Sequence, residues 1–166
     1  MLEAMNGSNG DSHGASSGDL DLPQILAALQ AIYEPQSSNE QRHNATTFLE
    51  QVKSDSAAPS HGFSLAQDTS QTPIARHYGL SLLEHAIRYK LDDFTGEECD
   101  TIRGWVIQLA QNISEDDPPF LRGKVARLWV DLAERNWGLD WMDMDESLCK
   151  LWQGSYVHHE LVLYMS

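Results

Sequence analysis

Residues 72–91 have the sequence TPIARHYGLSLLEHAIRYKL, and this stretch decides the fold class. Thr72 followed by Pro73 is typical of a helix start, because threonine caps free N–H groups and proline fits the first turn. Apolar side chains then spread around most of the helix, at Ile74, Ala75, Tyr78, Leu80, Leu82, Leu83, Ala86 and Ile87. A helix that is apolar this far round needs neighbours on more than one side, which a stack of helical hairpins provides.

Outward from this helix, apolar residues recur with helical spacing, and no stretch shows the sustained alternation typical of strands. We predict helices over residues 22–33, 38–52, 73–91, 96–113, 119–136 and 141–152, and the start of another over 155–166. Residues 54–71 are rich in Ser, Asp, Ala and Gln and are predicted to be a long polar connection. The predicted fold is an all-α solenoid of about three helix pairs plus the start of a fourth.

The two ends of the chain differ in composition. Residues 1–19 are mostly Gly, Ser, Asn and Asp, so we predict a disordered tail there and a helical region over residues 20–166. At the other end, residues 158–165 read HHELVLYM and open an amphipathic helix that has no partner in the sequence. We therefore expect an array of repeats that is truncated at its C-terminus.

The chain of 166 residues carries 25 acidic residues against 11 Lys and Arg, for a formal net charge of -14. A surface this acidic repels phosphate backbones, which disfavours nucleic-acid binding by this chain alone and favours a basic protein partner. Cys99 and Cys149 are too few for a disulfide framework or a four-ligand zinc site, which favours a reducing compartment. The longest apolar run, residues 161–165, is too short to cross a bilayer, so no membrane insertion is expected.

No motif in the sequence predicts catalysis or cofactor binding. The sequence contains neither a Walker loop nor a G-x-G-x-x-G motif, and no nucleophile motif follows a predicted strand. His77 and His85 are eight residues apart on one helix, too far apart to share a metal ion. We therefore predict a binding protein, not an enzyme, with no cofactor and no metal.

Two segments resemble the karyopherin-β family of nuclear transport receptors. Residues 76–91, RHYGLSLLEHAIRYKL, are similar to the first (A) helix of the family's second repeat. Residues 124–148, KVARLWVDLAERNWGLDWMDMDESL, are similar to the opening of the exportin-1/importin-β-like domain. Their spacing resembles the exportin-5/HASTY branch, although Gly138 and Met142 replace two prolines that usually follow tryptophans there.

The resemblance implies a superhelix of HEAT repeats, with A helices on the convex surface and B helices on the concave surface. It also implies that these repeats bind Ran-GTP, that the receptor contacts nucleoporin Phe-Gly repeats, and that it shuttles between nucleus and cytoplasm. For the exportin-5 branch the implied export cargo is a phosphoprotein, tRNA or structured RNA. Two alternatives stay open: an importin of the same superfamily, or a generic helical-repeat scaffold that binds proteins without a GTPase.

The residues expected to bind Ran lie on the predicted helices over 96–113 and 141–152. If the second, fourth and sixth predicted helices are the B helices, their polar side chains line the concave surface and suit a basic patch on a GTPase. The region is represented by Glu97, Asp100, Gln108, Asp143 and Glu146.

Overall fold

The computed structural model describes residues 21–136 and 143–165. In these two ranges the chain forms α-helices, one short 3₁₀ turn and no strand. The helices are α1 Leu22–Tyr33, α2 Asn39–Val52, α3 Ala58–Gln67, α4 Pro73–Tyr89, α5 Gly96–Gln111, α6 Pro119–Asn136, α7 Met144–Trp152 and α8 Tyr156–Met165. None of the helices described is both long and apolar enough to span a membrane. The predicted tail and the residues from Trp137 to Met142 lie outside the described ranges.

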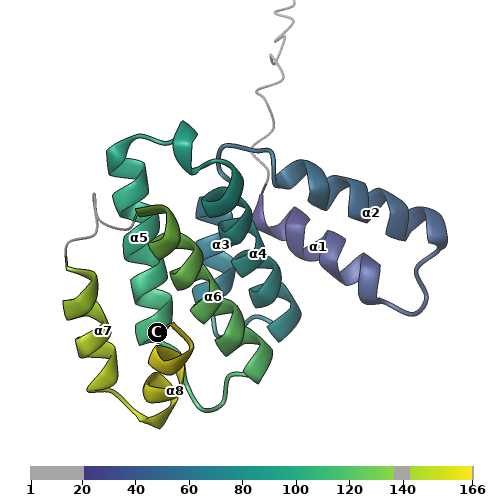
Figure 1. Cartoon of the computed structure of the whole chain (residues 1–166). Coiled ribbons are helices and arrows are strands. Elements are labelled where there is room, and N and C mark those ends of the chain that lie inside the picture. The colour runs from purple at the N-terminus through teal and green to yellow at the C-terminus, as the bar shows by residue number, and fades with distance from the viewer. Residues whose placement is uncertain (1–20, 137–142, 166) are drawn as a thin grey trace, which may run out of the picture.

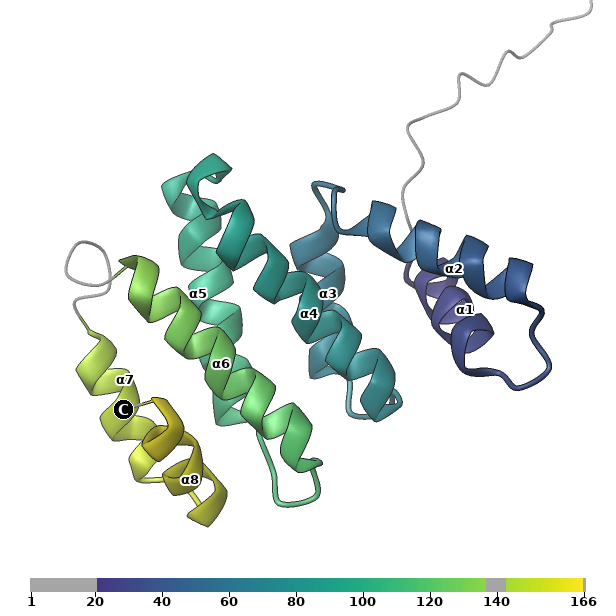
Figure 2. The same ribbon diagram turned by 45° about the vertical axis from the view of Figure 1, so that its right-hand side comes forward.

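The helices pack as consecutive pairs, α1 with α2, α3 with α4, α5 with α6 and α7 with α8 (Figure 1). The second helices α4, α6 and α8 lie side by side in one layer, in front of the first helices α3, α5 and α7 (Figure 2). Each pair from the second onward thus contacts the next pair through both layers. This arrangement confirms the predicted all-α solenoid of HEAT-type hairpins. The expectation that the last helix has no partner is wrong, because α8 packs against α7 and completes a fourth pair among the described residues.

The prediction that residues 54–71 form a polar connection is wrong, because they contain helix α3. The sequence of this helix, APSHGFSLAQ, buries mainly small residues such as Ala58, Gly62 and Ala66, which give a weak hydropathy signal. With α3 in place, α4 becomes the second helix of its pair, whereas residues 76–91 were expected to form a first helix. The same shift makes α5 and α7 first helices.

Side-chain caps fix where several helices begin. The hydroxyl of Thr72 accepts a hydrogen bond from the N–H of Ala75 at 3.2 Å, and Pro73 follows in the first turn, as predicted. Ser38 and Thr95 each form a capping box with the residue three positions later, Gln41 and Glu98. These caps satisfy backbone N–H groups that the first turn of a helix leaves free.

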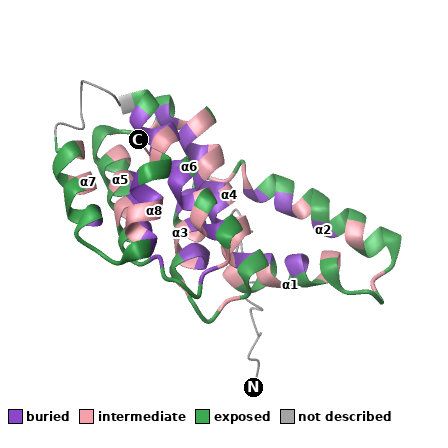
Figure 3. Cartoon of the chain, turned by 60° about the horizontal axis from the view of Figure 1, so that its bottom comes forward, coloured by how far each residue is buried: buried purple, intermediate pink, exposed green. Residues whose placement is uncertain are grey.

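The core lies where the helices face one another, and the outer faces are exposed (Figure 3). Trp129 of α6 is only 1% exposed. One cluster of buried side chains runs continuously through α3 to α8, and a second, smaller cluster belongs mainly to α1 and α2. Apolar side chains buried between successive helix pairs hold the layer of first helices and the layer of second helices together.

Candidate protein-binding surfaces

The five residues predicted to bind Ran are all exposed and lie on neighbouring helix pairs. Glu97, Asp100 and Gln108 are on α5, Asp143 precedes α7, and Glu146 is in the first turn of α7. Because α5 and α7 are first helices and contact each other, the structure brings these residues onto one layer. The expectation that this is the layer of second helices is wrong, whereas a role in binding Ran stays a prediction.

The acidic side chains of this layer differ in how far they are already paired. Asp100 forms an ion pair with Arg103 at 3.0 Å, and Glu146 forms one with Lys150 at 2.9 Å. The pair of Glu146 with Lys150 is exposed on both sides and contributes little to stability, whereas the Arg103 side chain is only 15% exposed. Within the described residues, the carboxylates of Glu97 and Asp143 make no ion pair, so these two charges are available to a basic partner.

The neighbouring Glu98 has a structural role. Its carboxylate accepts a hydrogen bond from the N–H of Thr95 at 2.8 Å and another from the Thr95 hydroxyl at 3.0 Å. These bonds, the backbone bond first, lower the pKa of Glu98 below its ordinary value. The carboxylate therefore stays ionised while it closes the capping box of α5.

The layer of second helices carries most of the basic residues. Seven of the eleven Lys and Arg residues are on α2, α4 and α6, at Arg42, Arg76, Arg88, Arg122, Lys124, Arg127 and Arg135. This distribution is the reverse of the acidic layer that the sequence led us to expect. The second helices, α8 included, also carry six acidic residues, whereas α5 and α7 carry five acidic and two basic residues, so the layer of first helices is the more acidic one.

Ion pairs join α4 to α6 along this layer. Asp131, only 5% exposed, accepts hydrogen bonds from Arg88 at 2.8 and 3.2 Å and lies 2.9 Å from the Nε of Arg127. One turn away, Glu84 pairs with Lys124 and with Arg88. A buried carboxylate needs such partners, because desolvation disfavours its charge. The pairs therefore lock the second helix pair onto the third.

A further ion pair involves the connection between α5 and α6. The guanidinium of Arg76 lies 2.5 Å from the buried carboxylate of Asp117 and also donates to the carbonyl of Ala66 at 3.2 Å. The other oxygen of Asp117 accepts from the N–H of Ser114 at 2.9 Å. Sequence reasoning did not predict these ion pairs, because their partners are far apart in the chain. Arg76 and Asp117 are 41 residues apart, and Arg88 and Asp131 are 43 residues apart. Opposite charges on α4 and α6 would have indicated them once the correct pairing of helices was known.

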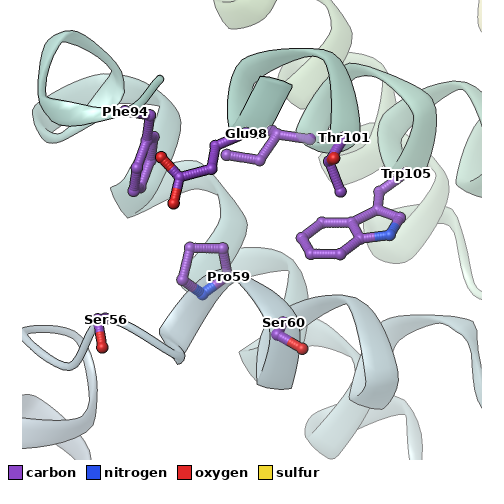
Figure 4. Close-up of a pocket in the computed structure, with 8 residues that line it drawn as sticks. Ser56, Pro59, Ser60, Phe94, Glu98, Thr101 and Trp105 are labelled. Atoms are coloured by element: carbon purple, nitrogen blue, oxygen red, sulfur yellow. The ribbon is translucent and has the colours of Figure 1, made fainter. Parts of the chain in front are cut away.

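An apolar cleft of about 130 Å³ lies between α3 and α5 (Figure 4). Its lining residues are Ser56, Pro59, Ser60, Phe94, Glu98, Thr101, Ile102 and Trp105. The indole of Trp105 stacks on Phe63, with ring centroids 5.0 Å apart, which fixes its orientation. A cleft this small, lined by the rings of Pro59, Phe94 and Trp105 together with hydroxyls and the Glu98 carboxylate, suits a single side chain of a partner.

The histidines make structural contacts. Burial, followed by the charge of Lys124, lowers the pKa of His77, and its ring meets the edge of Phe120 at 5.7 Å. The ring of His158 lies between Ser155 and the carbonyl of Gln111, at 2.9 Å from that oxygen. In the part of the chain that the structure describes, no three His, Cys, Asp or Glu side chains are grouped to hold a metal ion.

Comparison with known proteins adds what the geometry alone does not give. No family model matches the chain. It is 34% identical to Protein MSN5 of Saccharomyces cerevisiae over 167 aligned residues, which cover 92% of this chain and 13% of the yeast protein. It is 29% identical to exportin-5 of Dictyostelium discoideum and 28% identical to exportin-5 of Homo sapiens, over 84% and 86% of this chain.

These relatives are much longer than this chain, which covers 12% of each exportin-5. The aligned part nevertheless spans most of the helical array, and the array has the paired-helix architecture that the resemblance implies. Sequence similarity and fold thus agree with the motifs at residues 76–91 and 124–148. The chain belongs to the karyopherin family, where it is homologous to exportin-5 and Msn5.

Proposed function

We propose that this chain forms the Ran-GTP-binding repeats of an exportin-5-like nuclear export receptor. The observation that carries the proposal is the similarity to Msn5 and to exportin-5 over 84–92% of the chain. The paired-helix solenoid supports it, because such arrays offer extended surfaces to protein partners. The receptor acts by binding and shuttles between nucleus and cytoplasm.

Directional transport follows from a difference in affinity between nucleotide states. The receptor binds Ran-GTP and cargo together in the nucleus, and GTP hydrolysis in the cytoplasm releases both. For this to work, the repeats contact segments of Ran whose structure depends on the nucleotide, since equal affinity for the two states shifts nothing. The cargo proposed for the complete receptor is a phosphoprotein, tRNA or structured RNA, and no cargo contact is assigned to these helices.

Within this proposal, exposed residues of α5 and α7 meet a basic patch on Ran. The contact set is Glu97, Asp100, Gln108, Asp143 and Glu146. Their exposure and the unpaired carboxylates of Glu97 and Asp143 support the choice. Complementary charge of this kind raises the association rate and disfavours wrong partners.

The cleft between α3 and α5 is the proposed contact for nucleoporin Phe-Gly repeats. A phenylalanine ring would enter between Phe94, Pro59 and Trp105, which present apolar and aromatic surface. Aromatic pairs favour such edge or stacked contacts, and a single buried ring gives weak, rapidly reversible binding. Weak binding suits a receptor that passes through many such contacts in turn.

The proposal is tested by binding of purified Ran, loaded with a GTP analogue, to the chain and to charge-reversal variants. We expect Glu97→Lys with Asp100→Lys to slow association, because two favourable charges become repulsive. The matched control is Glu115→Lys with Asp116→Lys, which makes the same charge change at exposed residues of the α5–α6 connection. Equal effects of the two double variants would show that only net charge matters and would remove the assigned contact set.

An importin of the same superfamily remains the main rival within the family. Import cargo is released by Ran-GTP, whereas export cargo is retained with it. A receptor of full length that loses its cargo when Ran-GTP is added would therefore contradict the export assignment while leaving Ran binding intact.

A further inference from the structure

The first helix pair has a hydrophobic core that is largely its own. Its buried side chains are Ile25, Ala28, Leu29, Ala45, Leu49 and Val52. On the second pair they pack against Leu65, Ala75, Leu82 and the half-buried Tyr78. By contrast, α3 to α8 share a continuous core that includes large buried residues such as Trp129. Few buried residues of the second pair therefore join α1 and α2 to the rest of the chain.

Polar contacts between the first and the second helix pair are also few. Ion pairs connect the second pair to the third through Glu84 and Lys124 and through Arg88 and Asp131, and a longer pair between Arg122 and Glu160 reaches α8. Among the described residues, no ion pair crosses from α1 or α2 to α3 or α4. The hydrogen bond that crosses this boundary runs from the Tyr78 hydroxyl to the carbonyl of Leu49 at 2.8 Å.

Packing is also incomplete where α1 meets α4. Two adjoining cavities of about 520 and 200 Å³ share Leu29, Tyr33 and Ile74 in their walls, and the second reaches Phe120 of α6. Tyr33 is 61% exposed, Ile74 42% and Phe120 52%, so large apolar surfaces face this groove and remain open to water. Side chains that line a gap lack the close contacts that stabilise a filled interior.

The connection between the first and second pairs is a series of tight turns over residues 53–57. Ser54 donates to the carbonyl of Gln51 at 3.0 Å, and Asp55 donates to that of Val52 at 3.1 Å. The Asp55 carboxylate then accepts from the N–H of Ala57 at 2.7 Å. These bonds are local, and none of them involves α4, α5 or α6.

From these four observations we propose that α1 and α2 open together as one cooperative unit, hinged at residues 53–57, while α3 to α8 stay folded. The Tyr78 hydroxyl acts as the latch, because it is the polar contact that bridges the boundary. Opening carries Tyr33 away with α1 and uncovers Ala75 and Leu82 beside Ile74 of α4 and Phe120 of α6. The proposal does not depend on Ran binding, since it concerns the isolated chain.

The joint opening of α1 and α2 is tested by hydrogen exchange of the intact chain. Mass spectrometry monitors the exchange under conditions where its rate reports the opening equilibrium. Amides of α1 and α2 are expected to exchange with one common opening constant, at least about tenfold larger than that of α4 and α6. Tyr78→Phe is expected to raise that constant about fivefold, as loss of one hydrogen bond predicts, and to leave α4 and α6 unchanged.

Tyr89→Phe is the matched control, because Tyr89 lies on the same helix with its side chain 72% exposed. The variant removes a tyrosine hydroxyl that does not bridge the two helix pairs, and it is expected to leave the exchange of α1 and α2 unaltered. Equal protection of α1, α2, α4 and α6 would overturn the proposal, as would separate opening of α1 and α2. Unchanged exchange of α1 and α2 in Tyr78→Phe would overturn the role assigned to the Tyr78 hydroxyl.

Discussion

Gly62 of α3 and Gly79 of α4 meet backbone to backbone. A Cβ atom added to Gly79 would lie 2.5 Å from the carbonyl oxygen of Gly62, and one added to Gly62 would lie 2.7 Å from the carbonyl oxygen of Gly79. No side chain fits between two helices at this separation. The two glycines therefore allow the closest helix contact in the second pair, the pair that sequence reasoning did not predict.

Replacing Gly79 by alanine is expected to destabilise the fold by about 1–3 kcal/mol, because the new methyl group meets rigid backbone atoms. This loss exceeds the roughly 0.5–1 kcal/mol that alanine gains over glycine as a helix former. Urea unfolding measures the difference. The control is Gly104→Ala on α5, where a Cβ would meet nothing within 4 Å, and which should stabilise. A Gly79→Ala variant as stable as wild type would contradict close packing of α3 on α4.

Removal of the Asp117 carboxylate is expected to destabilise the chain by about 3 kcal/mol, since it leaves the largely buried guanidinium of Arg76 without a counter-ion. The Arg76 side chain is 14% exposed and the Asp117 side chain 6% exposed, so water replaces little of the lost contact. Asp117→Ala is compared with Asp116→Ala, its exposed neighbour, by thermal or urea unfolding. The neighbour is expected to change stability by less than about 0.5 kcal/mol. Equal effects would show that the ion pair has no special role.

Stability is expected to fall as the pH drops from neutral into the range below the ordinary histidine pKa. Burial lowers the pKa of His77 in the folded chain, so the unfolded chain binds more protons there and acid favours unfolding. In His77→Phe the loss of stability between pH 7 and pH 5 should be smaller than in wild type. Urea midpoints at several pH values measure the two slopes, and parallel slopes would remove His77 as the cause.

Filling the cleft between α3 and α5 is expected to abolish binding of a Phe-Gly peptide. Ser60→Trp places a large ring at the cleft rim and keeps the stack of Trp105 on Phe63. Binding is followed by NMR shifts of the tryptophan indole N–H groups, which detect weak complexes. The control is Gln108→Trp, an exposed position on the same helix as Trp105. If the peptide still shifts Trp105 in the Ser60→Trp variant, the cleft is not its site.

The sequence predicts most helices because their signals are strong. Thr72 and Pro73 mark the start of α4, and the apolar periodicity after them is long enough to identify the fold class. Helix α3 is missed because Ala58, Gly62 and Ala66 each bury little apolar surface, and the close contact of Gly62 with α4 cannot be read from local sequence. Once one helix is missed, every later helix is assigned to the wrong layer.

The same error explains the outcome for the candidate site. Side-chain type and exposure were predictable, so Glu97 and Asp143 are exposed acids as expected. The layer in which these residues lie depends on which helices pair, and that pairing is set by contacts between residues far apart in the sequence. The contact of Arg88 with Asp131, 43 residues away, likewise follows only from the packing of α4 on α6.

The most direct test of the central claim is the ratio of two dissociation constants, for Ran loaded with a GTP analogue and for Ran loaded with GDP, measured on this chain. We expect at least about tenfold tighter binding of the GTP form, which corresponds to a coupling free energy of about 1.4 kcal/mol. Equal affinities, or no binding of either form by a chain whose helices are intact by circular dichroism, would contradict it. The protein would then be a helical-repeat scaffold whose partner is not this GTPase.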